Sequence, residues 1–205
     1  MKHQEADLFQ FDEQKRCTAG IICGVDEAGR GPLAGSVYAA AVILPRNTVI
    51  KDLNDSKKLT EKTRNRLYDE IINTAEDYAI AEANVTEIEE INILNAAMLA
   101  MKRAVEALHV KPDYILIDGN QKPNLLINCE AVIKGDSLSA SIAAASVLAK
   151  VTRDRKMLET AELYPEYGFE KHKGYGTKLH YEKLREFGAC PIHRMSFLKK
   201  FYDRK

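Results

Sequence analysis

Four carboxylates in this 205-residue chain stand where short apolar runs end. Asp26 and Glu27 directly follow the run IICGV, Asp118 follows YILI, and Asp136 follows AVIKG. In open α/β sheets, functional sites form at the carboxyl ends of the strands. If these runs are neighbouring strands, we expect all four acids to converge at one edge of a sheet.

Converged carboxylates repel one another unless protons or cations neutralise them. Mg²⁺ and Mn²⁺ prefer oxygen ligands, and two such ions about 3.5–4 Å apart can clamp a phosphodiester while one activates a water. An isolated Asp at a strand end is more often a turn or helix-cap residue. Its repetition after three separate runs favours a metal site for phosphodiester chemistry.

The turn Gly29-Arg30-Gly31 comes directly after the first two acids. Glycines let main-chain N–H groups approach a ligand closely, and Arg30 adds a partner for a phosphate. A plain tight turn before Pro32 accounts for the same residues. The position of the turn beside the acids is what favours a contact with substrate.

The elements that must position these residues divide into two halves. The apolar runs 21–25, 37–44 and 78–85, bounded by turn residues or a short helix, predict an antiparallel meander. The short helix is expected over 61–72, with Thr60 as its N-cap.

The second half predicts helices that alternate with strands, which favours parallel pairing. Apolar residues spaced three and four apart indicate a helix over about 89–108, and Ser137 is expected to cap a long buried helix over 138–157. We further expect strands at 114–117 and 131–133, a Gly- and Lys-rich loop at 168–176, and a helix at 177–187. The whole is predicted to be an α/β domain with a mixed sheet.

The composition is that of an ordinary globular protein, 45% hydrophobic and 29% charged with a net charge of zero. Residues 1–19 form a polar lead-in without the apolar stretch of a secretory signal, and no run approaches the roughly 20 residues that span a bilayer. The four cysteines form no close pair, so we expect reduced structural thiols and a cytoplasmic location. From Lys150 onward 14 Lys/Arg face 8 Asp/Glu, which suits a phosphate-binding surface or simply solvated helices.

Several segments together resemble the motifs of the ribonuclease HII family. In chain order they are DEAGRGPLAG from Asp26, DSKKL from Asp55, ILIDG from Ile115, KGD from Lys134 with SIAAAS from Ser141, GYGT from Gly174, and HRMSF from His193. The similarity runs from about Ile21 to Phe197, in the order of the family.

This resemblance implies a ribonuclease H-like fold, with a central mixed five-stranded sheet flanked by helices and a small helical C-terminal part. Residues 20–160 would form the catalytic domain, and 161–205 an extension that contributes to substrate binding. The implied activity is metal-dependent endonucleolytic cleavage of the RNA strand of RNA–DNA hybrids, with nicking 5′ of ribonucleotides embedded in DNA. The implied cofactor is Mn²⁺ or Mg²⁺, and we expect a monomer.

The resemblance also implies roles for single residues. Asp26, Glu27, Asp118 and Asp136 would bind the metals, and the main chain of Gly29, Arg30 and Gly31 would read the ribose 2′-OH. Tyr175 would pack on the sugar at the RNA-to-DNA step, and Lys57 and Lys58 would touch phosphates. Further candidates for positioning or backbone contacts are Ser139, Ser141, Ser146, Lys150 and Arg153. His172 and His193 are candidates for phosphate or proton duties, although surface histidines are the more usual case.

Two other functions remain open on the sequence alone. A hybrid-binding protein without activity is disfavoured because all four acids are present. A different metal-dependent phosphotransfer enzyme, such as a DNA resolvase or a small-molecule phosphatase, would ignore the 2′-OH. Cleavage of matched ribo and deoxy substrates separates these alternatives.

Overall fold

The computed structural model describes residues 2–203, with side chains from Asp7 onward. A five-stranded sheet lies at its centre, with the spatial order β3-β2-β1-β4-β5. The strands are β1 (Ile22–Ala28), β2 (Val37–Ile43), β3 (Asp77–Ala83), β4 (Tyr114–Asp118) and β5 (Cys129–Val132). The pairs β1–β2 and β2–β3 are antiparallel, whereas β1–β4 and β4–β5 are parallel. Both the predicted meander and the predicted parallel half are therefore confirmed.

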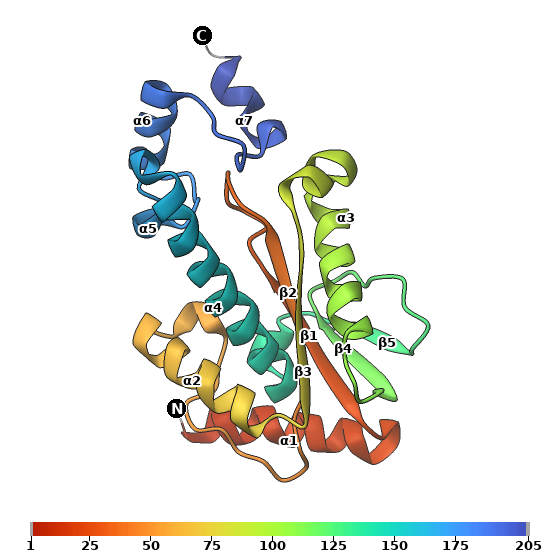
Figure 1. Ribbon diagram of the computed structural model, residues 1–205. Helices are drawn as coiled ribbons and strands as arrows, with labels where there is room; N and C mark the ends of the chain where they lie inside the picture. The colour runs from red at the N-terminus through yellow and green to blue at the C-terminus, as the bar shows by residue number, and fades with distance from the viewer. Residues whose placement is uncertain (1, 204–205) are drawn as a thin grey trace.

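Helices cover both faces of this sheet (Figure 1). Helix α3 (Val85–Glu106) lies on one face, and α2 (Glu61–Thr74) and α4 (Ala140–Leu163) lie on the other. Successive residues of β2 point to opposite faces, so that Ala39 packs toward α3 and Ala40 toward α4. The buried strands are apolar because both of their faces are covered.

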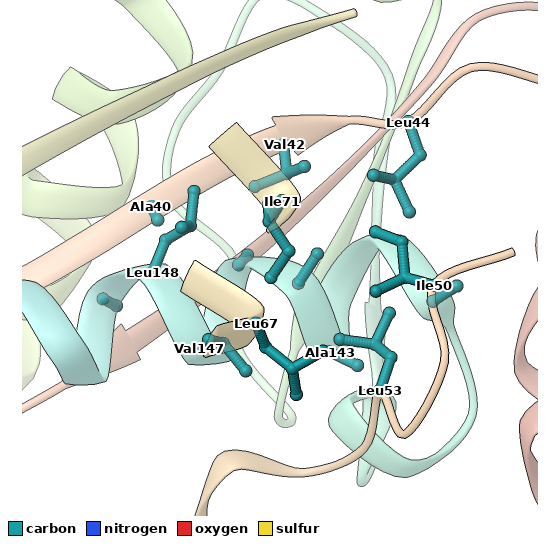
Figure 2. Close-up of a cluster of buried hydrophobic side chains, with 14 of the residues drawn as sticks. Ala40, Val42, Leu44, Ile50, Leu53, Leu67, Ile71, Ala143, Val147 and Leu148 are labelled. Atoms are coloured by element: carbon teal, nitrogen blue, oxygen red, sulfur yellow. The ribbon is translucent and has the colours of Figure 1, made fainter. Parts of the chain in front are cut away.

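The cluster on the α4 face joins β2, α2 and α4 around small alanines (Figure 2). Gly24 of β1 permits the closest approach, because a Cβ atom there would lie 2.1 Å from the main-chain carbon of Ser141. Helix α4 thus packs directly on the main chain of β1, two residues after the start of that strand's buried run. This contact brings the N-terminal end of α4 close to the strand that carries Asp26.

Two helix starts differ in instructive ways. Thr60 caps α2 as predicted, by accepting a hydrogen bond from the Thr63 amide. The long helix begins at Ala140 and its N-cap is Ser139, so the prediction of Ser137 as the cap is wrong. The residues Gly135–Ser137 form instead a 3₁₀ turn, η2. Lys134, the residue before this turn, has a left-handed main-chain conformation (φ 56°). This extra turn is what places Asp136 at the site.

The polar segment at the N-terminus is a regular helix, α1 (Lys2–Ala19), that packs against the rest of the chain. Leu8 and Asp12 are buried on it. The Asp12 carboxylate accepts hydrogen bonds from Ser139 Oγ at 2.6 Å, from Ser141 N at 2.8 Å and from Ser141 Oγ at 2.7 Å. Helix α1 has no broad apolar face, and the hydrogen bonds of Asp12 hold it against the first turn of α4.

The C-terminal part extends past one end of the sheet (Figure 1). It contains the short helix α5 (Phe169–His172), α6 (Lys178–Phe187) and α7 (Met195–Tyr202). These helices share a third cluster with Leu33 and Ala34 of the β1–β2 loop. Among the described residues, no helix has the length and apolar character needed to cross a membrane.

Candidate active site

Three of the four predicted acids meet at the carboxyl end of the parallel strands. Asp26 comes from β1, Asp118 from the neighbouring β4, and Asp136 from η2 before α4. Each offers a carboxylate oxygen, and the three oxygens lie within 4.8 Å of one another. The Asp136 amide also donates to Asp118 Oδ1 at 3.3 Å, which ties the two segments together.

Burial and mutual repulsion dominate the electrostatics of this cluster, and the charge of Lys57 offsets them only in part. Burial, reinforced by the charges of Glu27 and Asp118, raises the pKa of Asp26 well above its usual value. Burial and the charges of Asp118 and Asp55 likewise raise the pKa of Asp136. Such raised values mean that the folded protein disfavours the charged carboxylates. A divalent cation with oxygen ligands would reverse this penalty, so the donor set fits Mg²⁺ or Mn²⁺.

Glu27 lies beside this cluster but is not one of its three mutually close acids. Its side chain accepts a hydrogen bond from Arg30 Nη1 at 3.2 Å. Glu27 and Asp118 line the same hollow of about 300 Å³, together with Arg30, Leu94 and Met98. The glutamate thus lies beside the acidic cluster and lines this hollow.

The loop that carries Lys57 approaches the site from the other side. Lys57 Nζ lies 4.0 Å from Asp136 Oδ2. Partial burial lowers the pKa of Lys57, but the charges of Asp26, Asp136 and Asp55 outweigh that effect and raise it. Ser146 of α4 anchors the loop, because its hydroxyl lies 2.7 Å from Ser56 Oγ.

Asp55 is a functional candidate that reasoning from strand ends missed. It accepts a hydrogen bond from the Lys57 amide at 2.9 Å and interacts with the carboxyl group of Asp136. It does not follow an apolar run, so the pattern that found the other acids does not include it. Its place in the DSKKL segment was the available signal.

The Gly29–Gly31 turn lies next to Tyr175, although 144 residues separate Gly31 from the tyrosine. A Cβ atom on Gly31 would lie 3.9 Å from Tyr175 Cε1. The Leu33 amide donates to the Gly174 carbonyl at 2.8 Å, which joins the two loops. Gly29 has a φ of 104°, where a side chain is strained, and a Cβ atom there would meet Arg153 Nε at 2.3 Å. Only glycine therefore fits at this position of the turn.

Tyr175 is 41% exposed at the surface beside this turn. Lys150 Nζ lies 5.5 Å from the centre of its ring, and the guanidinium carbon of Arg153 lies 5.6 Å from it. Arg153 is buried and its Nη2 donates to the carbonyls of Ala34 at 3.2 Å and Lys173 at 3.0 Å. Of the helix residues singled out by sequence, Lys150 and Arg153 thus support the tyrosine.

The serines have other partners. Ser139 and Ser141 bind Asp12, and Ser146 binds Ser56. They hold α1 and the Lys57 loop against α4. Asp12 was not recognised as important, because its partners lie more than 120 residues away and no local pattern marks it. Lys58 Nζ donates to Ser137 Oγ at 3.1 Å.

Three histidines form a buried group beneath the Tyr175 loop, so the expectation of surface histidines at 172 and 193 is wrong. His172, His180 and His193 are 7%, 0% and 2% exposed. The Cys190 amide donates to His193 Nδ1 at 2.9 Å, and the Gly174 amide donates to His172 Nδ1 at 3.2 Å. Both of these ring nitrogens must therefore be unprotonated.

The positions of the other ring protons follow from these two unprotonated nitrogens, His193 Nδ1 and His172 Nδ1. With Nδ1 bare, His193 carries its proton on Nε2 and donates it to His180 Nε2, 3.0 Å away. His180 then carries its own proton on Nδ1, which donates to the Tyr175 carbonyl at 3.0 Å. Cys190, His193 and His180 thus form a one-directional chain of hydrogen bonds that ends on the main chain of the exposed tyrosine.

Comparisons with known proteins agree with this geometry. A family model described as Ribonuclease HII matches residues 23–200. A Ribonuclease HII from Caldicellulosiruptor bescii is 56% identical over 201 residues, which cover 97% of this chain and 98% of that protein.

Solved structures extend the similarity to the fold. The crystal structure of the ribonuclease H2 from Pyrococcus horikoshii OT3 superposes with a TM-score of 0.73 at 26% identity, over 89% of this chain and 97% of that one. Bst-RNase HIII in complex with Mn²⁺ shares the fold with a TM-score of 0.62 at 19% identity, over 83% of this chain and 63% of that one.

One conclusion follows from the sheet order, from the convergence of acids from β1, β4 and η2, and from the near full-length match. The resemblance read from the motifs is confirmed, and so is the predicted ribonuclease H-like fold. The chain belongs to the ribonuclease HII family, and it is a ribonuclease H, an endonuclease that hydrolyses RNA paired to DNA.

Proposed function

We propose that Asp26, Glu27, Asp118 and Asp136 hold the catalytic divalent ions, Mn²⁺ or Mg²⁺, of this endonuclease. The observation that carries the proposal is the approach of three carboxylate oxygens to within 4.8 Å of one another. Asp26 and Asp136 are almost fully buried, and burial raises the pKa of both. Negative groups so placed are more stable with a bound cation than without one.

Divalent ions in such a site act as Lewis acids that activate water and offset charge on the leaving oxygen. The residues of the chain supply the geometry. Asp26 and Asp118 stand on adjacent parallel strands, so their separation is set by the sheet. Glu27 and Asp118 line the neighbouring hollow. Glu27 would therefore bind a metal from the side on which substrate enters. Products would carry a 5′-phosphate and a 3′-hydroxyl.

Gly29, Arg30 and Gly31 are proposed to read the ribose 2′-OH through their main chain, the group by which protein contacts distinguish RNA from DNA. Tyr175 lies against Gly31 and would pack on the sugar at the RNA-to-DNA step. Lys57 stays charged beside Asp136 and would contact a phosphate. These contacts would let the enzyme nick DNA 5′ of an embedded ribonucleotide as well as cut long hybrids.

Residues 20–160 would serve as the catalytic domain, and residues 161–205 would contribute to substrate binding because they carry Tyr175 and the histidines beneath it. We further propose that the protein acts as a monomer, since both halves of the site come from one chain; light scattering of the purified enzyme tests this. All four cysteines are free thiols, which supports a reducing, cytoplasmic location, testable by cell fractionation.

The deciding experiment compares three duplexes of one sequence: an RNA–DNA hybrid, a DNA duplex with one ribonucleotide, and DNA alone. With Mn²⁺ or Mg²⁺ we expect cleavage of the first two, 5′ of the ribonucleotide in the second, and none of the third. Excess EDTA should stop the reaction. Cutting of all three at similar rates would point to a phosphotransfer enzyme that ignores the 2′-OH, and binding without cutting would point to a hybrid-binding protein.

A further inference from the structure

Arg194 is fully buried, and its guanidinium group holds the loop that contains Gly29 and Gly31. Nη2 donates to the Gly29 carbonyl at 2.7 Å and to the Gly35 carbonyl at 2.6 Å. Nη1 donates to the Arg30 carbonyl at 3.1 Å and the Pro32 carbonyl at 2.9 Å. Nε donates to the Gly35 carbonyl at 2.9 Å. Five hydrogen bonds from one side chain thus end on four main-chain carbonyls of a single loop.

These carbonyls determine where the neighbouring amides point. In a planar trans peptide, the C=O of one residue and the N–H of the next point in opposite directions. Because Arg194 draws the carbonyls of Gly29 and Arg30 inward, the amides of Arg30 and Gly31 face away from the arginine. Those are two of the main-chain groups assigned above to the ribose.

We propose that Arg194 is a positioning residue for ribose recognition, which it serves by fixing the direction of the Arg30 and Gly31 amides. The inference rests on the proposed role of Gly29–Gly31 and adds the residue whose hydrogen bonds hold those amides in place. Arg194 itself touches no substrate, since its side chain is 0% exposed. Its charge is costly there, because burial, with Arg153 nearby, lowers its pKa to about 9.

The chemistry of arginine suits this task. Its planar fork offers five N–H donors in fixed directions, whereas lysine offers three on a rotatable ammonium. A lysine at this position keeps the charge but reaches fewer of the four carbonyls. The loop needs such support, because Gly29 stands at a φ of 104°.

The main chain of Arg194 binds the same loop. Its amide donates to the Leu33 carbonyl at 2.8 Å, and the Gly35 amide donates to the Ile192 carbonyl at 2.9 Å. The segment before α7 and the loop after β1 therefore form one unit, although they lie about 160 residues apart. The C-terminal part thereby orients amides that belong to the first strand's loop.

The test measures binding rather than stability. The affinity of Arg194→Lys and of wild type is measured for an RNA–DNA hybrid and for an all-DNA duplex of the same sequence. Ca²⁺ replaces the catalytic ion so that binding is measured without cleavage, and gels verify that no product forms. We expect affinity for the hybrid to fall about tenfold, the effect of losing one hydrogen bond. Affinity for DNA should stay within about twofold, because phosphate contacts dominate it.

Arg16→Lys is the matched control. Arg16 is also a buried arginine whose Nη2 donates to a main-chain carbonyl, that of Leu44 at 2.7 Å, but it lies on α1. It should lose stability while keeping the wild-type ratio of hybrid to DNA affinity. A purely structural role of Arg194 would lower both affinities together, as general unfolding does.

The outcomes separate the two proposals. If wild type binds hybrid and DNA equally, the proposed role of Gly29–Gly31 is wrong. If wild type prefers the hybrid and Arg194→Lys keeps that preference, the assignment of Arg194 alone is overturned. Should the lysine variant not fold, Arg194→Gln, which retains N–H donors without the buried charge, is measured in the same way. Failure of both to fold would make Arg194 a determinant of the fold and overturn the narrower role.

Discussion

The Nε2 atoms of His180 and His193 lie 3.0 Å apart, and only one of them carries a proton. The Cys190 amide at one end of the chain and the Tyr175 carbonyl at the other fix the direction of that hydrogen bond. Protonation of either ring replaces a donor–acceptor pair with two donors. The support beneath Tyr175 therefore depends on neutral histidines.

The pH dependence of stability should reveal this arrangement. Burial lowers the pKa of His180 to about 4 in the folded protein, against about 6.5 when unfolded. The unfolded state therefore binds a proton between these values that the folded state does not, and stability is lost as pH falls from 6.5 toward 4. The advantage of wild type over His180→Gln in free energy of unfolding should shrink by about 1.4 kcal/mol per pH unit in that window.

Urea denaturation at several pH values measures the difference. A constant difference between wild type and His180→Gln would show that His180 titrates alike in both states, contrary to the hydrogen-bonded chain described above.

Asp26→Asn should abolish cleavage and leave the fold intact. The change removes one proposed metal ligand, and we expect the rate with Mn²⁺ or Mg²⁺ to fall by about three orders of magnitude or more. In EDTA the variant should be more stable than wild type by about 1 kcal/mol, because the buried charge and its repulsion by Glu27 and Asp118 are gone.

Single-turnover cleavage and thermal unfolding check the two parts. Asp69→Asn on α2, an exposed carboxylate, should leave both unchanged. Near wild-type cleavage by Asp26→Asn would remove Asp26 from the proposed metal site.

Asp12→Ala should destabilise the protein without touching the active site. Loss of the carboxylate leaves the Ser141 amide and two serine hydroxyls without their buried acceptor, at a cost of about 2–3 kcal/mol. Asp7→Ala, an exposed position on the same helix, should change stability by less than about 0.5 kcal/mol. Equal free energies of unfolding for the two variants would show that the hydrogen bonds of Asp12 to Ser139 and Ser141 do not stabilise the contact between α1 and α4.

Tyr175→Ala should reduce cleavage at a single ribonucleotide by about tenfold, because it removes the aromatic ring that is proposed to pack on the sugar. Tyr175→Phe should keep most of the activity. Phe187 is a control in the same C-terminal part, because it is an exposed aromatic residue on α6. If Phe187→Ala lowers the rate as much as Tyr175→Ala does, the defect is general to this part of the chain.

Much of the framework was predictable because it depends on local patterns. Alternating and continuous apolar runs identified the five strands, and Asp26, Asp118 and Asp136 could be found because each follows such a run or the turn after it. Thr60 was predictable as an N-cap, because capping depends on residues within one turn.

The parts that sequence reasoning missed depend on distant partners. α1 has no strong apolar periodicity, and it is held by Asp12 through serines more than 120 residues away. The burial of His172 and His193 comes from a cluster assembled by three separate segments. Ser137 and Ser139 are both of a residue type that caps helices, and only the 3₁₀ turn around Asp136 makes Ser139 the cap.

The length and rigidity of helix α4 have a consequence for the position at which the nucleic-acid strand is cut. Its first turn follows the segment that carries Asp136, and its later turns carry Lys150 and Arg153 beneath the tyrosine ring. Helix rise is constant at about 1.5 Å per residue, so the helix fixes the separation between the acidic cluster and the Tyr175 ring. With the metals and the sugar bound as proposed at the two ends of α4, the cut should fall at one constant offset from the ribose, whatever the flanking bases.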